Sequence, residues 1–418
     1  MSRVIFHVDV NSAFLSWEAT RRVANGGIDL RLIPSVIGGD PTKRTSIVTA
    51  KSIPAKKYGI VTGEPVSAAI RKCPKLVIAG SDFELYSRMS RAFKAICREY
   101  TPVVEEFSID ECFLDMTTMG KLFPDPVKTA YQLKDRIREE LGFTVNVGVA
   151  HNKILAKMAS DFEKPDKVHT LFEDEIADKM WPLPVGELFL CGKASAQKLN
   201  AVHIETIGDL ARADLTTIRA ILGEKLGRQL WSYANGIDDS PVNPEREAPK
   251  GYGNEITFDD NITDYKTGDN VILHLADNVA ARVRRDGVQA TCVSVTIRGN
   301  DMKKHSHQHK LDSATDSTTR VFDVAKELLH EVWDGKTPLR LIGLTMTDIE
   351  GEDQEKQLSL FDSLQTASGA ETVSTSNEAD DEKNRLADKA VDAVREKYGR
   401  DIIKRGGMLN SDIHPRKK

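Results

Sequence analysis

The chain has 418 residues, of which 40% are apolar and 29% charged, and its formal net charge is −5. This length suits two to four domains with real hydrophobic cores. The five cysteines include no CxxC pair, which argues against a disulfide scaffold or a cysteine metal site. No apolar run approaches the roughly 18 residues of a membrane span, and the N-terminus has no signal-peptide pattern. We expect a soluble cytoplasmic protein with no membrane partner.

The first 165 residues predict an α+β domain. Residues 3–10, RVIFHVDV, form a buried strand, and a helix follows through about residue 23. Residues 25–75 are short elements broken by glycine and proline. A helix at 82–100, a hairpin around 105–116, a helix at 126–141, a strand at 143–150 and a helix at 152–162 follow. This order of elements around an insertion predicts a ferredoxin-like fold.

The rest of the sequence divides into three stretches. Residues 170–237 predict short helices, and 188–213 look like a helix–hairpin–helix pair. A second α+β unit at 246–350 is predicted to contain helices at 268–287 and 317–335 and strands at 291–299 and 339–349. From residue 351 the composition is polar, which predicts a disordered linker. One amphipathic helix at 382–398 and a basic end complete the chain.

Three carboxylates are candidates for one site. Asp9 ends the first strand, and Asp110 and Glu111 are adjacent in the hairpin sequence EEFSIDECFLDM. Adjacent strand residues point to opposite faces, so one acid would face a core, where an unpaired carboxylate costs several kcal/mol. If the first strand lies beside the hairpin, the three acids meet and require a cation. Carboxylates select Mg²⁺ or Mn²⁺, and two such ions can activate a primer 3′-oxygen and stabilise leaving pyrophosphate.

The residues alone leave a second interpretation open. Asp110 and Glu111 can cap a tight turn, and Asp9 can cap the helix behind it, because isolated acids are common at turns. In that case the three carboxylates are exposed to solvent, and no metal ion is needed to neutralise them.

The motifs FHVDVNSAF and SIDECFLD resemble the two carboxylate motifs of the Y-family (DinB/UmuC-type, DNA polymerase IV-like) translesion DNA polymerases. The resemblance continues, in the family's order, through VTAKSIPAKKYGI, YSRMSRAF, VGVAHNKILAKMASDFEKP, ETIGDLA and LWSYANGID, and covers roughly residues 3–350. It implies a DNA-directed DNA polymerase of low fidelity that extends primers past damaged bases, in DNA repair and damage-induced mutagenesis.

The resemblance also implies a division into domains. These are a ferredoxin-like palm (1–24 and 76–165), small fingers (25–75), a helical thumb with the helix–hairpin–helix (166–240), an α+β little finger (246–350), and a clamp-binding peptide with a disordered, flexible C-terminal tail (351–418). A monomer is expected.

Site roles follow from the same resemblance. Asp9 and Asp110 are similar to the family's metal ligands, with the Val10 carbonyl as a backbone ligand, and Glu111 matches its catalytic acid, also at the metal site. Two Mg²⁺ ions per active site are implied. Phe14 matches the bulky residue under the sugar, where a ring leaves no room for a 2′-hydroxyl. The structural alternative for Phe14 is plain core packing.

Lys56 and Lys164 occupy positions where the family places cations on the nucleotide triphosphate. The sequence departs from the family at Ile53, where an aromatic hydroxyl is common, and at Lys56, where arginine is common. Without the aromatic hydroxyl and the bidentate guanidinium contact, we expect weaker binding of the nucleotide phosphates. The hairpin at 188–213 departs too, because its usual Gly-x-Gly turn keeps only Gly192.

Local positive charge lies in ARVRR (281–285) and IRGNDMKKHSHQHK (297–310), where the resemblance implies a sheet laid along primer–template DNA. His305, His307 and His309 alternate, so they would share one face of a strand. That face is either a zinc site or a hydrated, DNA-facing surface.

The peptide QLSLF at 357–361 resembles the segment by which bacterial polymerases dock on the sliding clamp. Leu358, Leu360 and Phe361 can fill an apolar groove while Gln357 forms hydrogen bonds. The alternative is that Leu360 and Phe361 fold back onto the neighbouring sheet as a stabilising strap.

Two other functions compete with the polymerase. A nucleotide cyclase has a similar palm and metal-binding acids, but the hairpin region and the clamp-like peptide argue against it. A catalytically inactive Y-family-like scaffold that recruits repair proteins to the clamp would have lost its acids, whereas Asp9, Asp110 and Glu111 are all present. We therefore expect an active polymerase whose partners are primer–template DNA, deoxynucleoside triphosphates and the sliding clamp.

Overall fold

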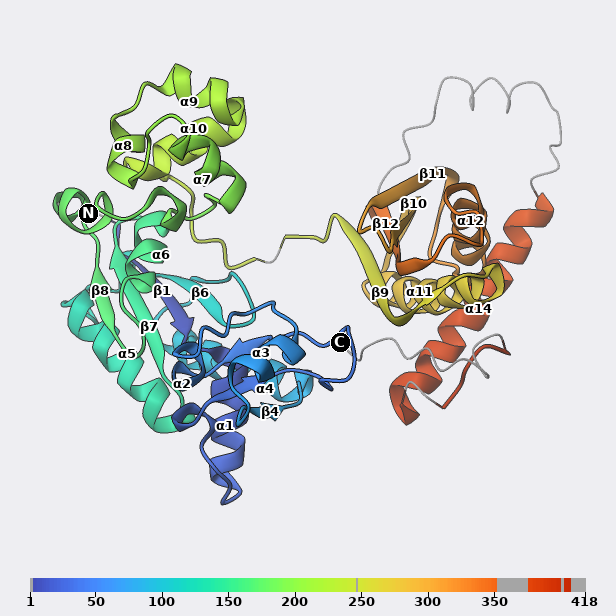
Figure 1. Ribbon diagram of the computed structural model, residues 1–418, viewed down its shortest axis with the longest axis horizontal. Coiled ribbons are helices and arrows are strands. Elements are labelled where there is room, and N and C mark those ends of the chain that lie inside the picture. Colours follow the sequence, from blue (N-terminus) through green and yellow to red (C-terminus); the bar gives the residue numbers. More distant parts are fainter. Residues whose placement is uncertain (1–2, 246, 352–374, 400–401, 407–418) are drawn as a thin grey trace. The chain divides into compact units, whose positions relative to one another are not determined.

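The computed structural model describes residues 3–245, 247–351, 375–399 and 402–406. The chain forms two compact units, Met1–Arg246 and Glu247–Lys418, and each contains a β-sheet covered by helices (Figure 1). The expected mixed α+β class is confirmed. Within the described part of the chain, no helix combines the length and the apolar character needed to cross a membrane.

The first unit is built on a five-stranded sheet with the order β5-β6-β1-β7-β8. Its strands are β1 (Ile5–Val10), β5 (Val104–Glu106), β6 (Glu111–Asp115), β7 (Val145–Ala150) and β8 (Val168–Thr170). The central strand β1 pairs antiparallel with both β6 and β7, and β7 pairs parallel with β8. The strand expected at 3–10 therefore lies beside the hairpin expected at 105–116, which brings their acids to one sheet.

The helices that flank this sheet are α1 (Ala13–Ala24), α4 (Phe83–Tyr100), α5 (Pro126–Leu141) and α6 (Lys153–Asp161). The even-numbered residues of β1 pack into the main core with α1, α4 and α5. The odd-numbered residues, which include His7 and Asp9, face α6 on the other side. Gly148 of β7 lets α6 approach closely, because a Cβ there would lie 1.9 Å from the carbonyl oxygen of Ala156.

Two smaller layers complete the first unit. A three-stranded sheet with the order β3-β2-β4 is accompanied by two short helices: β2 (Ser35–Ile37), β3 (Ala50–Lys51), α2 (Ile53–Lys56), α3 (Val66–Lys72) and β4 (Val77–Ala79). Four helices follow β8: α7 (Lys193–Asn200), α8 (Ile207–Arg212), α9 (Leu215–Leu222) and α10 (Glu224–Ala234). Their core is continuous with α6, and Asp238, just past α10, accepts a hydrogen bond of 3.1 Å from the Ile154 N–H at the start of α6.

The second unit contains a four-stranded antiparallel sheet with the order β11-β10-β12-β9. Its strands are β9 (Gly251–Ile262), β10 (Val288–Gly299), β11 (Lys304–Thr315) and β12 (Leu339–Gly351). Helices α11 (Tyr265–Arg285) and α12 (Thr318–Val332) pack on one face and enclose the core. The other face of the sheet carries neither helix.

The helix expected at 382–398 is present as α14 (Thr375–Tyr398), and it packs against α11 and α12 (Figure 1). A buried ion pair holds it there. The side chains of Arg284 in α11 and Asp388 in α14 are 3% and 4% exposed, with 3.1 Å between nitrogen and oxygen. Asp388 also accepts a 2.8 Å hydrogen bond from the N–H of Thr318 at the start of α12. This docking was not predicted from the sequence.

Candidate active site

Strands β1 and β6 bring two of the three acids face to face. Asp9 and Glu111 are direct partners in the antiparallel ladder, so their side chains lie on the same face, which α6 covers. Asp110 lies just before β6, and its carbonyl accepts a 3.0 Å hydrogen bond from the Val10 N–H. The three predicted acids therefore stand at one end of the sheet, as the strand order required.

Ser108 organises the turn that carries Asp110 and Glu111. The N–H groups of Phe107 and Ser108 both donate to the Glu111 carbonyl at 3.2 Å. The Ser108 hydroxyl lies 2.8 Å from Asp110 Oδ1 and 3.1 Å from Glu111 Oε2. It has one proton, so it donates to one carboxylate at a time. The sequence analysis missed this residue, although a serine shortly before adjacent acids is a known turn signal.

Two lysines from the α6 segment supply positive charge to the acids. The Nζ of Lys157 contacts Glu111 Oε1 and lies 3.8 Å from Asp9 Oδ2. The Nζ of Lys164 contacts Asp9 Oδ2. Both lysines also pair with Asp161, at 3.2 and 2.8 Å. Asp9 is therefore bound to lysines instead of capping α1, so the interpretation of Asp9 as a helix cap is wrong.

Burial sets the protonation of this cluster. It raises the pKa of Asp9 to about 6, although Lys164 and Lys157 act in the opposite direction. Burial would lower the pKa of Lys157, but Asp161, Asp9 and Glu111 together raise that pKa above its ordinary value. The Lys164 pKa is raised in the same way by Asp9 and Asp161. Both lysines are therefore ammonium ions at neutral pH.

His7 is fully buried next to the acids. Its Nδ1 lies 2.8 Å from the Ser160 hydroxyl oxygen, and that hydroxyl donates to the Lys157 carbonyl at 2.8 Å. Nδ1 must then carry the proton that Ser160 accepts, an assignment made from the hydrogen-bond chain. Nε2 lies 3.8 Å from Glu111 Oε1 and has no hydrogen-bond partner in the described structure. Burial, with two nearby lysines, holds the pKa of His7 well below its ordinary value, so the ring is neutral.

The donor set fits a hard divalent cation. Carboxylates and a backbone carbonyl such as that of Val10 are the oxygen ligands that Mg²⁺ takes. Among the described residues, no three histidine, cysteine or acidic side chains converge closely enough to hold an ion between them. The carboxylates of Asp9 and Glu111 meet lysines, and that of Asp110 meets Ser108.

Phe14 and Lys56, which are also predicted to contact nucleotide, lie on different helices, α1 and α2. Phe14 is half-buried in the first turn of α1, and its ring stacks on Tyr86 of α4 with centroids 4.6 Å apart. Its core packing is confirmed. Lys56 is exposed at the end of α2, in the small second sheet layer. Lys51 of β3, which the sequence analysis missed, is close enough that burial and Lys56 together lower its pKa.

The hairpin before α7 has a residue in the left-handed region where the resemblance implies a glycine. Leu190 has a φ of 69°, in the left-handed region that favours glycine, two residues before Gly192. Leu190 therefore adopts a backbone conformation that costs a residue with a side chain more than it costs glycine.

The second unit offers a polar surface on the open face of its sheet. Six residues of β10 and β11 pair across this face: Ser294 with Gln308, Thr296 with Ser306, and Arg298 with Lys304. Hydroxyl, amide and basic side chains suit the phosphate backbone of nucleic acid, which they contact without reading sequence.

The three histidines of β11 lie on the opposite, helix-covered face. His305, His307 and His309 share one face, as predicted, but their direct partners are the buried residues Ile297, Val295 and Val293. His307 Nδ1 lies 2.7 Å from Glu331 Oε2 of α12. All three histidines are nevertheless exposed on this edge strand, so the hydrated, DNA-facing alternative stays a prediction. Zinc gains no support, since no metal-holding group is found among the residues that the structure describes.

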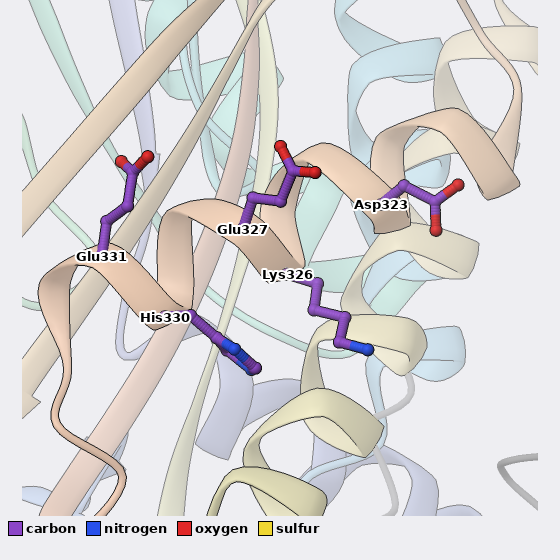
Figure 2. A pocket seen from close by; sticks show the side chains of 5 residues that line it. All are labelled: Asp323, Lys326, Glu327, His330 and Glu331. Carbon is purple, nitrogen blue, oxygen red and sulfur yellow. The ribbon is translucent and has the colours of Figure 1, made fainter.

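A shallow depression on α12 is lined by five charged or titratable side chains (Figure 2). Glu327 and Glu331 point to one side, whereas Lys326 and His330 point to the other. Asp269 of α11 pairs with His330 at 2.8 Å and with Lys326 at 3.6 Å. These contacts tie the two helices together, and the depression includes none of the residues of the acid cluster.

Comparison with known proteins identifies the family of this chain. The sequence profile described as impB/mucB/samB family matches residues 8–161, and its C-terminal domain profile matches 249–360. Residues 191–238 match a profile described as DNA polymerase-iota, thumb domain. A DNA polymerase IV of Clostridium acetobutylicum is 43% identical over 413 residues, which cover 99% of this chain and 100% of that protein. The chain belongs to the DNA polymerase IV group of the Y-family.

Other relatives of this Y-family polymerase are similar over the same length. DNA polymerase IV 1 of Bacillus subtilis is 36% identical over 413 residues, 98% of this chain and 94% of that protein. A solved Y-family DNA polymerase chimera matches with a TM-score of 0.72 and 25% identity, over 83% of this chain and 99% of that one. The predicted fold class is confirmed, as is the function of a DNA-directed translesion DNA polymerase. Polymerases of this family act on DNA and deoxynucleoside triphosphates and generally use a divalent metal.

Proposed function

We propose that Asp9, Asp110, Glu111 and the Val10 carbonyl hold two Mg²⁺ ions and form the nucleotidyl-transfer site of this polymerase. When bound, the ions assist loss of the primer 3′-hydroxyl proton and neutralise the leaving pyrophosphate. One observation carries the proposal: Asp9 and Glu111 are direct partners on adjacent strands, with Asp110 at the same end of the sheet.

The chain's own residues would bind and orient the nucleotide. Lys164 is 36% exposed and reaches the acids from beyond the end of α6, so it is placed to exchange Asp9 for the triphosphate. Lys56 and its neighbour Lys51 supply charge from the second sheet layer. The ring of Phe14, fixed by its stack on Tyr86, is proposed to exclude a 2′-hydroxyl.

The test compares Asp110→Ala and Glu111→Ala with Asp115→Asn, an acid at the far end of β6 whose carboxylate accepts a 2.9 Å bond from the Thr117 N–H. Loss of a charged group at the reacting centre should lower the primer-extension rate by at least about a hundredfold. DNA affinity should stay near that of wild type, because these acids do not hold the duplex. Wild-type extension by either site variant refutes the assignment, whereas Asp115→Asn should extend normally.

We also propose that the open face of the second unit's sheet follows the DNA backbone. The support is its row of hydroxyl and basic side chains. Replacing Lys304 and Arg298 by glutamine should weaken binding to all DNA sequences alike and reduce its salt dependence. A sequence-dependent loss would point to base contacts instead.

The clamp-binding peptide at 357–361 lies outside the described residues. Our proposal that it docks on the bacterial sliding clamp rests on the sequence, in which Leu358, Leu360 and Phe361 stand close together in a polar segment, with Gln357 as the hydrogen-bonding residue.

A further inference from the structure

The facing pair Asp9 and Glu111 presents an electrostatic problem. Like charges that are direct cross-strand partners repel each other and destabilise the sheet. In the structure, the ammonium of Lys157 contacts Glu111 and lies 3.8 Å from Asp9. The Lys157 and Asp9 side chains are each 10% exposed, so water screens this contact little. A cation that belongs to the chain therefore joins the two proposed metal ligands.

The helix that carries Lys157 is firmly placed. Asp161, one turn further along α6, pairs with Lys157 at 3.2 Å, and the Lys157 carbonyl accepts a 2.8 Å hydrogen bond from Ser160. On the sheet side, a Cβ at Gly148 would lie 1.9 Å from one α6 backbone atom and 2.6 Å from the Ser160 nitrogen. The helix is thus as close to β7 as a glycine allows. Moving Lys157 away requires either a new side-chain conformation or a shift of the whole helix.

Lys164 differs in this respect. It lies beyond the end of α6, and its side chain is 36% exposed. An exposed lysine can change partners at little cost, which suits a group that is proposed to follow the triphosphate. Lys157 has no such freedom, and it meets both acids.

We propose that Lys157 is a positioning residue, a built-in counter-ion that keeps Asp9 and Glu111 together and competes with divalent cations for their carboxylates. The inference rests on the proposed function, because it takes the two acids to be metal ligands.

Two consequences follow from removing this charge. Without a metal ion, the two facing carboxylates lose a buried partner, and leaving a buried charge uncompensated is strongly destabilising. When a metal ion is added, the variant site lacks one positive charge that wild type has within about 4 Å of the acids, so the variant binds a divalent cation more tightly. A lysine that served only to pack α6 would produce the first effect without the second.

The experiment uses the full-length polymerase without DNA or nucleotide. Lys157→Met removes the charge at similar length, Lys157→Gln is a more polar second variant, and Lys157→Arg keeps the charge. Lys153→Met is the matched control, because Lys153 lies one turn earlier on α6 and pairs with Glu105 at 2.7 Å, away from the acids. Melting temperature is measured in rising MnCl₂, and Mn²⁺ binding is followed by electron paramagnetic resonance.

We expect Lys157→Met and Lys157→Gln to have lower melting temperatures than wild type without Mn²⁺. Adding Mn²⁺ should raise their melting temperatures more than that of wild type, and their Mn²⁺ affinity should be at least about tenfold higher. Lys157→Arg should behave like wild type. Lys153→Met should melt lower but show the wild-type response to Mn²⁺. If both uncharged variants bind Mn²⁺ no more tightly than wild type does, the proposed role of Lys157 is overturned, but the metal assignment of the acids is not. If Mn²⁺ stabilises none of the proteins, the metal assignment of the acids fails, and this inference fails with it.

Discussion

Gly148 fixes the spacing between β7 and α6, and Gly148→Ala is the sharpest test of that spacing. An added Cβ would lie 1.9 Å from the Ala156 carbonyl oxygen, against an ordinary contact of about 3.3 Å, so α6 must retreat by roughly 1.4 Å. The backbone of Gly148 is not in the left-handed region, so the effect is steric and not conformational. Overpacking costs typically 1–3 kcal/mol and sometimes more. We expect a loss of about 3 kcal/mol, which lowers the melting temperature by about 6–12 °C for a unit of this size.

The assay for Gly148→Ala is thermal unfolding followed by tryptophan fluorescence, because three of the four tryptophans lie in the first unit. Gly120→Ala is the control, since a Cβ there meets nothing within 4 Å, and its effect should stay within about 0.5 kcal/mol. Because α6 carries Lys157 to the acids, Gly148→Ala should also slow primer extension below the melting range. Unfolding and extension like those of Gly120→Ala would refute the claim that close α6 packing positions the site.

Three further predictions concern other parts of the chain. Phe14→Ala should raise the use of GTP relative to dGTP opposite template cytosine by at least about tenfold in steady-state kinetics, and an unchanged ratio would leave Phe14 a packing residue. Asp388→Ala should destabilise the second unit by about 3 kcal/mol or more, because Arg284 loses a buried partner; trypsin should then cut α14 faster, and wild-type resistance would contradict the docking. Replacing Leu360 and Phe361 by alanine should remove clamp-stimulated synthesis without changing the melting temperature. A protein that melts several degrees lower yet responds fully to the clamp would favour the strap.

The sequence predicted the parts of the fold that depend on local pattern. Apolar residues indicated the buried strand at 3–10 and the hairpin at 105–116. The amphipathic pattern gave the helix at 382–398. These features depend on residues close together in the chain, so a single sequence is enough to reveal them.

Contacts between segments far apart in the chain could not be predicted from the sequence. Lys157 falls in the helix predicted at 152–162, but its meeting with Glu111 depends on how closely α6 packs on the sheet, which periodicity does not encode. The same is true of Arg284 and Asp388, which are about a hundred residues apart in the chain. The alternation of the β11 histidines was correct, but which face of the sheet they occupy is set by their partners on β10.

Metal-directed cleavage of the backbone tests whether the acids at the ends of β1 and β6 hold the catalytic divalent ions. Fe²⁺ takes the place of Mg²⁺, and ascorbate with peroxide then produces radicals that cut the backbone beside the bound ion; mass spectrometry maps the cuts. We predict cuts near residues 9–10 and 108–111 that disappear in Asp110→Ala. Cuts confined to other segments, such as the histidine strand at 304–310, or cuts near the acids that persist in Asp110→Ala, would contradict this prediction.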